Sequence, residues 1–250
     1  MNFKPKLVAF DLDGTLAESK QPMSAEMGEL LSELLNHAYV AVLSGAGLPQ
    51  IDTQFLPAFP ETAHFAKLYL FPTNAAECFT YRQNSWQAQY DKSFNAFEKR
   101  RIMQALKEAM EETGFAEPPS KVWGERIEDR GGEITFSALG QHAPVEEKRK
   151  WDPTREKRKP LYDALVRRLP DFSVALNATT SIDITPKGVN KAYGIRKLVE
   201  LTGVSVSEML YVGDALEEGG NDATVIETGI RTHEVFGPDE TAALIKHILA

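Results

Sequence analysis

Two carboxylates lie two positions apart where an apolar run of the chain ends. Asp11 and Asp13 follow Leu7–Phe10, a run that predicts a short buried strand. Because burying an uncompensated carboxylate is costly, we expect both acids at the carboxyl end of this strand, facing a crevice and sharing a cation. Gly14 allows a sharp turn that brings backbone N–H groups near a phosphate. The alternative is a strand that ends in an ordinary acidic turn.

A hydroxyl follows the next predicted strand. Ser44 and Gly45 come directly after the apolar run Tyr39–Leu43, and Ser44 offers a hydroxyl while Gly45 exposes its amide. Such groups at a strand end suit a phosphate oxygen, as parallel sheets bind ligands at this edge. The alternative is a plain strand-to-loop turn.

Later segments supply a cation and further oxygen ligands. Lys191 begins a predicted helix, and Asp214 ends the predicted strand Met209–Val212. The segment Gly219-Gly220-Asn221-Asp222 follows and opens another helix. Carboxylates gathered at one point repel each other unless a cation lies among them. Oxygen ligands without Cys or His favour Mg²⁺ over zinc. The expected Mg²⁺ ligands are Asp11, the Asp13 carbonyl and Asp214, with Asn221 or Asp222 acting directly or through a second layer.

The stretch Phe10–Leu16, read Phe-Asp-Leu-Asp-Gly-Thr-Leu, resembles the signature of the haloacid dehalogenase (HAD) superfamily of phosphotransferases. The resemblance implies that Asp11 is the nucleophile, which accepts the phosphoryl group as an aspartyl phosphate. It also implies that Asp13 is the general acid and base. Lys191 would neutralise the phosphate and keep the nucleophile ionised; taken alone, it reads as a surface lysine.

Composition excludes several other classes of protein. The 250 residues carry a net charge of −8, which argues against nucleic acid as the main partner. Cys78 is the single cysteine, so a disulfide framework and a thiolate metal cluster are excluded. The sequence has no apolar signal segment and no run of membrane length, so we expect a cytoplasmic enzyme without a membrane partner.

The order of predicted elements indicates an α/β fold in two parts. A Rossmann-like, doubly wound parallel sheet is expected in a HAD-like core over residues 1–81 and 187–250. Residues 82–186 read as an inserted α+β cap that carries substrate specificity. The cap prediction rests on a helix, a hairpin and a strand pair, at Lys92–Thr113, at Val122–Glu128 with Glu133–Leu139, and at Phe172–Asn177 with Ser181–Thr185.

The position of the insertion resembles HAD proteins with a type IIB cap, and three stretches are similar to eukaryotic-type α-phosphomannomutases. These stretches are Ile127–Gly132, Ser181–Gly188 and Gly213–Asp222. The resemblance implies that Arg130 binds a sugar phosphate and that Ser181 and Asp183 bind hydroxyl groups.

Three positions depart from the arginines of that family. Lys20 and Lys148 each stand where the family has an arginine, and Gln141 replaces a third. All three remain predicted substrate-binding positions. Lysine lacks the bidentate fork that grips a phosphate, and a mutase must hold a bisphosphate while excluding water. We therefore expect a phosphatase of a phosphorylated sugar or similar metabolite.

Two alternatives stay open. The first is a hexose-phosphate mutase of the phosphomannomutase or phosphoglucomutase type, which uses the same aspartyl phosphate. The second, a non-catalytic module that binds phosphometabolites, would require a broken nucleophile or metal site. The resemblance also implies a possible homodimer through the cap.

Overall fold

The computed structural model describes residues 3–177, 179–218 and 220–250 and divides the chain into two compact units. The first unit comprises the described residues up to Asp91 together with Asn190–Ala250, and the second comprises Lys92–Val189. The described residues contain no helix that is both long and apolar enough to cross a bilayer.

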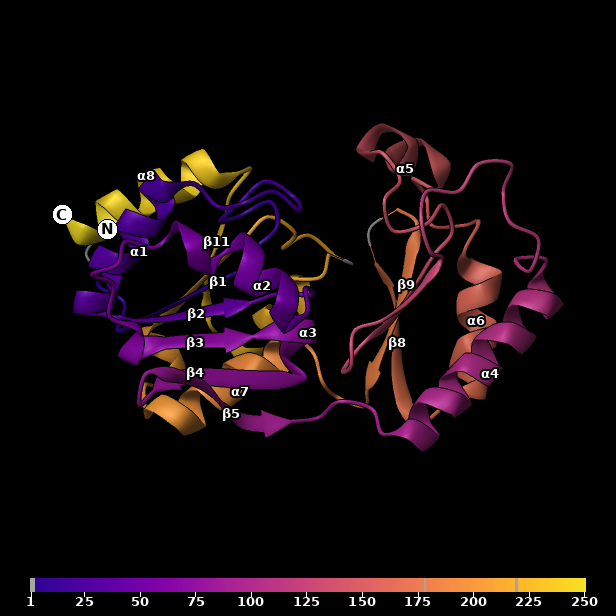
Figure 1. Ribbon diagram of the computed structural model, residues 1–250, viewed down its shortest axis with the longest axis horizontal. Coiled ribbons are helices and arrows are strands. Elements are labelled where there is room, and N and C mark those ends of the chain that lie inside the picture. The colour runs from indigo at the N-terminus through magenta and orange to yellow at the C-terminus, as the bar shows by residue number, and fades with distance from the viewer. Residues whose placement is uncertain (1–2, 178, 219) are drawn as a thin grey trace. The chain divides into compact units, whose positions relative to one another are not determined.

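The first unit is built on a sheet with the strand order β11-β10-β1-β2-β3-β4-β5 (Figure 1). The strands from β11 to β3 are parallel, whereas β4 and β5 pair antiparallel at one edge. The strands are β1 (Leu7–Phe10), β2 (Tyr39–Leu43), β3 (Leu68–Phe71), β4 (Glu77–Arg82), β5 (Ser85–Asp91), β10 (Met209–Gly213) and β11 (Arg231–Glu234).

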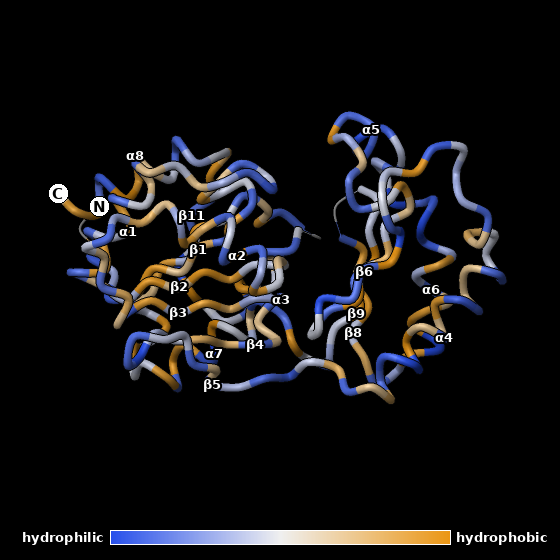
Figure 2. Tube along the Cα trace, in the orientation of Figure 1, coloured by the Kyte–Doolittle hydropathy of each residue, from blue (hydrophilic) through white to orange (hydrophobic). Residues whose placement is uncertain are grey.

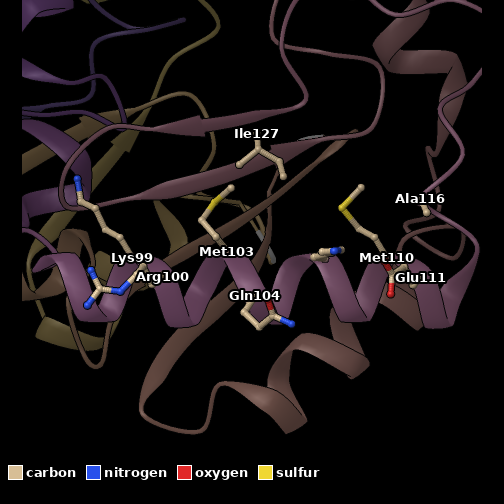
Figure 3. Close-up of a pocket in the computed structure, with 9 residues that line it drawn as sticks. Lys99, Arg100, Met103, Gln104, Met110, Glu111, Ala116 and Ile127 are labelled. Atoms are coloured by element: carbon tan, nitrogen blue, oxygen red, sulfur yellow. The ribbon is translucent and has the colours of Figure 1, made fainter.

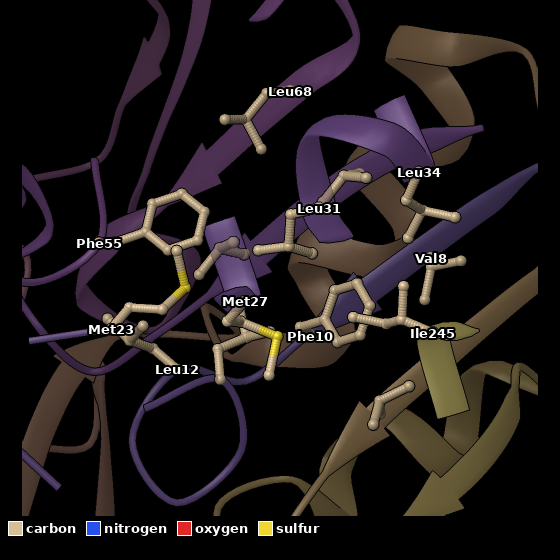
Figure 4. Close-up of a cluster of buried hydrophobic side chains, with 14 of the residues drawn as sticks. Val8, Phe10, Leu12, Met23, Met27, Leu31, Leu34, Phe55, Leu68 and Ile245 are labelled. Atoms are coloured by element: carbon tan, nitrogen blue, oxygen red, sulfur yellow. The ribbon is translucent and has the colours of Figure 1, made fainter. Parts of the chain in front are cut away.

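Helices cover both faces of this sheet, as the doubly wound prediction requires. Alternate strand residues such as Val8 and Phe10 pack with Leu31 and Leu34 of α1, in the cluster drawn in Figure 4. Strand residues whose side chains point to the other face of the sheet, such as Ala9, pack with α7. Figure 2 shows the central strands β1, β2 and β3 as apolar. The helices of this unit are α1 (Ala25–His37), α2 (Leu48–Gln54), α3 (Pro72–Ala75), α7 (Lys191–Thr202), α8 (Pro238–Leu249) and the 3₁₀ turns η1 (Leu56–Ala58), η2 (Phe65–Lys67), η3 (Val206–Glu208) and η4 (Ala223–Thr228).

The strand order brings together the strand ends that carry the predicted site residues. The chain moves from β1 to β2 and β3 on one side, while β10 lies on the other side of β1. The sheet therefore has a switch point between β1 and β10, and ligands bind beyond the carboxyl ends of strands at such points.

The second unit is a separate α+β body. Its antiparallel sheet has the order β6-β7-β9-β8, and α4 and α6 share an apolar core with residues such as Ile134, Phe136 and Ile182. Beside α4 lies a groove of about 740 Å³, lined by Met103, Met110 and Ile127 among others (Figure 3). The elements are α4 (Ala96–Thr113), β6 (Ile127–Asp129), β7 (Ile134–Ser137), α5 (Val145–Trp151), α6 (Lys159–Arg168), β8 (Phe172–Asn177) and β9 (Ser181–Pro186).

The boundary of the insertion differs from the prediction. The sequence analysis placed the cap at residues 82–186, but β5 pairs with β4 in the first sheet and the second unit spans Lys92–Val189. Residues 82–91 were assigned to the cap because they lack an apolar run: Trp86 and Tyr90 pack on the core of the first unit, but most of the other side chains of the edge strand β5 are polar.

Candidate active site

Three carboxylates meet at the switch point of the first sheet. Asp11 follows β1, Asp214 follows β10 and Asp222 precedes η4, and one oxygen of each lies within 4.8 Å of the others. The parallel pairing of β1 with β10 fixes the first two. Gly219, part of the predicted motif before Asp222, lies outside the described residues.

Two glycines make room for these carboxylates. A Cβ on Gly14 would lie 2.3 Å from Oδ2 of Asp214, and a Cβ on Gly213 would lie 2.3 Å from Oδ2 of Asp222. Gly14 also has a φ of +85°, which glycine adopts without the strain of other residues. Any side chain at these positions would push a carboxylate out of the cluster.

Lys191 joins the two ends of the cluster. Its buried Nζ lies 2.6 Å from Oδ1 of Asp11 and 2.6 Å from Oδ1 of Asp222. Helix α7 carries Lys191 in its first turn and approaches the sheet through Gly194, where a Cβ would lie 2.7 Å from Leu43. Burial disfavours the ammonium, but Asp11 and Asp222 outweigh it, so the Lys191 pKa is raised and the side chain is charged.

The residues present suit a divalent cation. Burial raises the pKa of Asp11 to about 8, and Lys191 offsets this only in part. Burial, followed by Asp222, also raises the pKa of Asp214. An added cation among these oxygens would favour their ionised forms. Asp11 and Asp214 have the oxygen chemistry that Mg²⁺ prefers, and the full predicted ligand set stays a prediction.

We expect Mg²⁺ to raise the thermal midpoint of unfolding (Tm) of this protein. A ligand that binds only the folded state adds about 2.7 kcal/mol at a hundredfold excess over its Kd. Thermal unfolding at neutral pH, in chelator and then in Mg²⁺, measures the shift. Asp214→Asn should remove most of it, whereas Asp239→Asn, an exposed control in the first turn of α8, should retain it. An equal shift in both variants would contradict a metal site at Asp214.

Asp13 is held by groups that the sequence analysis did not identify. Its Oδ1 accepts hydrogen bonds from Nε2 of Gln54 at 2.9 Å and from the backbone N–H of Lys20 at 2.6 Å. Gln50 in turn donates to Oε1 of Gln54 at 2.8 Å. Gln54 ends α2 and is buried, and the sequence carried no signal for this contact because only the packing of α2 brings Gln54 to Asp13. The predicted position Lys20 thus lies beside Asp13, with its side chain exposed.

Ser44 directly follows β2, which is the neighbour of β1 in the sheet. Its buried Oγ accepts a hydrogen bond from the backbone N–H of Ala46 at 3.0 Å. The backbone N–H of Asn74 donates to the Ser44 carbonyl at 2.8 Å, and Asn74 has a left-handed φ of +53°. The loop that carries Ser44 and Gly45 is therefore braced by the turn after β3.

In the second unit, three predicted substrate-binding residues lie together. Arg130 donates to Glu133 at 2.9 Å and to Glu128 at 2.7 Å, and its NH2 also contacts Oε1 of Gln141 at 3.5 Å. Nζ of Lys148 donates to the Gln141 carbonyl at 3.3 Å. Of the three positions that depart from the family arginines, Gln141 contacts Arg130 and Lys148 contacts Gln141, whereas Lys20 lies in the first unit.

Ser181 and Asp183 lie on β9, with side chains on the face opposite to the apolar core formed by Ile182 and Ile184. Ser181 shares a hydrogen bond of 3.0 Å with Ser137 of β7. Asp183 accepts from Nδ2 of Asn177 at 2.6 Å, and burial raises its pKa although Arg130 lies close enough to oppose this. A polar face of this sheet therefore carries both predicted residues.

Comparisons with known sequences point to one family. A family model described as eukaryotic phosphomannomutase matches residues 27–250. A phosphomannomutase of Schizosaccharomyces pombe is 28% identical over 253 residues, which cover 98% of this chain and 95% of that protein. The phosphomannomutase of Saccharomyces cerevisiae is 24% identical over 252 residues, covering 98% and 95%.

Solved structures with the same fold are more distant in sequence. A haloacid dehalogenase-like hydrolase from Bacteroides thetaiotaomicron has a TM-score of 0.62 at 17% identity, covering 98% of this chain and 100% of that one. The C-terminal domain of trehalose-6-phosphate phosphatase from C. albicans has a TM-score of 0.67 at 15% identity, covering 99% and 93%. At these identities the likeness shows the fold, and it confirms the predicted HAD-like α/β architecture.

Proposed function

Because this chain belongs to the eukaryotic phosphomannomutase family, we propose that it is a HAD-superfamily hexose-phosphate mutase that moves a phosphoryl group between two hydroxyls of one sugar. The sequence analysis favoured a phosphatase and kept the mutase as the alternative. The family match and the relatives named phosphomannomutase support the alternative better. The observation that carries the chemistry is the contact of Lys191 with Asp11, beside Asp214 at the β1–β10 switch point.

The proposed reaction begins with attack by Asp11 on phosphorus, in line with the leaving oxygen. The phosphorus–oxygen bond to the donor breaks while a bond to the Asp11 carboxylate forms, which gives an aspartyl phosphate. Lys191 orients Asp11 and neutralises charge on the phosphoryl group. Asp13 donates a proton to the leaving oxygen and then removes one from the sugar hydroxyl that accepts the phosphoryl group. When bound at Asp11 and Asp214, Mg²⁺ would supply charge neutralisation during both transfers.

We propose that the second unit recognises the sugar. Arg130 supplies the guanidinium fork for a phosphate, and Ser181 and Asp183 present a hydroxyl and a carboxylate to sugar hydroxyls. Lys148 and Gln141 adjoin Arg130, so the phosphate would meet one fork and one point charge there rather than several forks. This is the feature that favours a phosphatase as the second candidate, since a weaker grip gives water more opportunity to accept the phosphoryl group.

An assay with mannose 1-phosphate separates the two candidates. For a mutase we expect mannose 6-phosphate to form faster than free phosphate, with activation by a hexose bisphosphate. Glucose 1-phosphate should be tested in parallel, with both products measured in the same reaction. Free phosphate as the main product, with no isomerised sugar at any bisphosphate concentration, would reject the mutase in favour of the phosphatase.

If Gln141 and Lys148 weaken phosphate binding, arginine at these two positions should favour the mutase reaction. The double substitution Gln141→Arg with Lys148→Arg should increase the ratio of isomerised sugar to free phosphate by about tenfold, the value of one added charge-assisted hydrogen bond. Lys150→Arg, on the same helix α5 and 72% exposed in its side chain, is the matched control and should leave the ratio unchanged. A ratio that does not respond to the double substitution would remove these positions from the phosphate-binding site.

A further inference from the structure

Tyr211 places a hydroxyl beneath the carboxylate cluster. It lies in β10, where Leu210 and Val212 face the α1 side of the sheet and Tyr211 faces the α7 side. The side chain is fully buried, and its hydroxyl donates to Oδ1 of Asp222 at 2.6 Å. A buried hydroxyl needs a partner, and a bond to a carboxylate is about twice as strong as a neutral one. Tyr211 and Asp222 therefore fix one another.

The same oxygen of Asp222 also accepts from Lys191 at 2.6 Å, and Nζ of Lys191 lies 2.6 Å from Asp11. A continuous hydrogen-bonded series therefore runs from Tyr211 through Asp222 and Lys191 to the nucleophile. The second oxygen of Asp222 accepts from the backbone N–H of Ala215 at 3.2 Å. Each oxygen of Asp222 thus accepts from at least one protein donor, and these contacts hold Asp222 in the orientation that meets Lys191.

We propose that Tyr211 is a positioning residue for phosphoryl transfer, acting on Asp11 through Asp222 and Lys191; this inference rests on the proposed function. The hydroxyl satisfies part of the charge on Oδ1 of Asp222, so the ammonium of Lys191 is shared with Asp11. Without the hydroxyl, Asp222 has a stronger hold on Lys191, and the ammonium shifts away from Asp11 and from the phosphoryl group. The contact between Lys191 and Asp11 orients the nucleophile for the transfer step, so we expect the larger effect in kcat.

Tyr211→Phe tests the proposal because it deletes one oxygen atom and keeps the ring. We expect kcat to fall about tenfold to a hundredfold, in the range that charge-assisted hydrogen bonds contribute. The KM for mannose 1-phosphate should stay within about twofold of its value in the unaltered protein. The same holds for the Kd of Mg²⁺, measured by calorimetry on the substrate-free protein. Tyr69→Phe is the matched control, since Tyr69 is a buried tyrosine of β3 on the same face of the sheet. It should keep the kcat of the unaltered protein.

A double-substitution cycle identifies the route of the effect. Asp222→Asn should lower kcat, and adding Tyr211→Phe should lower it little further, because both changes interrupt one series of contacts. If Tyr211→Phe does not yield folded protein, Tyr211→Met removes the same hydroxyl and is measured in the same way. An unaltered kcat in the folded variant would overturn the proposal, and so would a loss confined to Mg²⁺ affinity. If the unaltered protein itself transfers no phosphoryl group, the proposed function fails instead.

Discussion

Asp11→Asn should lower kcat for phosphoryl transfer by at least about 10⁴-fold, the scale on which enzymes lose activity when a covalent nucleophile is removed. Asparagine keeps the shape of the side chain but offers no carboxylate to attack phosphorus. Isomerised sugar and free phosphate should be lost together, since both proposed reactions pass through the same aspartyl phosphate. The measurement is the initial rate of each product from mannose 1-phosphate.

The same variant should fold. Burial raises the pKa of Asp11 to about 8, above its usual value of 3.8. A carboxyl group whose pKa is raised on folding reduces stability progressively as pH rises above the unfolded-state pKa. Replacing it with asparagine removes that cost, so in chelator at neutral pH the Tm should be equal to that of the unaltered protein or higher. A folded Asp11→Asn protein that retains activity would show that the activity belongs to a contaminant, and would revive the non-catalytic binding module.

The positions of the candidate catalytic residues of the first unit could be predicted because these residues follow apolar runs. Asp11, Ser44 and Asp214 each come directly after a short buried strand, and parallel strands deliver their carboxyl ends to one edge of the sheet. Ser24 starts α1 through an equally local contact, since its hydroxyl accepts from the backbone N–H of Met27. A motif of this kind is contained within a few residues, so folding of the rest of the chain does not alter it.

Residues that act through distant partners could not be predicted from such patterns. Gln54 meets Asp13 across 41 positions, and only the packing of α2 on the sheet brings them together. Tyr211 reads as one more apolar residue of a buried strand, because its hydroxyl partner Asp222 lies beyond the strand end. The edge strand β5 was missed for a local reason, since the two-residue turn that joins it to β4, Gln83-Asn84, has left-handed φ values without the glycine that usually marks such a turn.

Arg158 shows the same limit in the second unit and carries the largest stability effect that we expect. The basic stretch from Glu146 to Lys159 reads mainly as a solvated face, yet Arg158 is fully buried. Its Nε donates to Asp152 at 2.8 Å, and its NH1 donates to the carbonyls of Asn177 at 2.8 Å and Ser181 at 2.5 Å. One guanidinium thus ties the start of α6 to the turn between β8 and β9.

Arg158→Met should destabilise the second unit by about 3–5 kcal/mol, because it leaves the buried Asp152 without its charged partner and with backbone N–H donors alone. Urea unfolding measures this in a Trp86→Phe background, where Trp123 and Trp151 remain as fluorescent reporters of the second unit. Lys159→Met is the matched control: its side chain is 63% exposed and pairs with Asp163. An exposed pair contributes about 0–1 kcal/mol. Equal losses in the two variants would contradict a special role for the buried pair.

A double variant separates two effects of Arg158: its charge pairing with Asp152, and its hydrogen bonds to the carbonyls of Asn177 and Ser181. Asp152→Asn combined with Arg158→Met removes both charges, so the double variant should be more stable than the sum of the single losses predicts. It should not recover sugar binding, because the carbonyls of Asn177 and Ser181 still lack their donor and Ser181 begins the strand that carries Asp183. We therefore expect Arg158→Met to raise the KM for the sugar phosphate, and the double variant to keep this raised KM. A KM restored together with stability would mean that Arg158 affects Ser181 and Asp183 only by keeping the second unit folded.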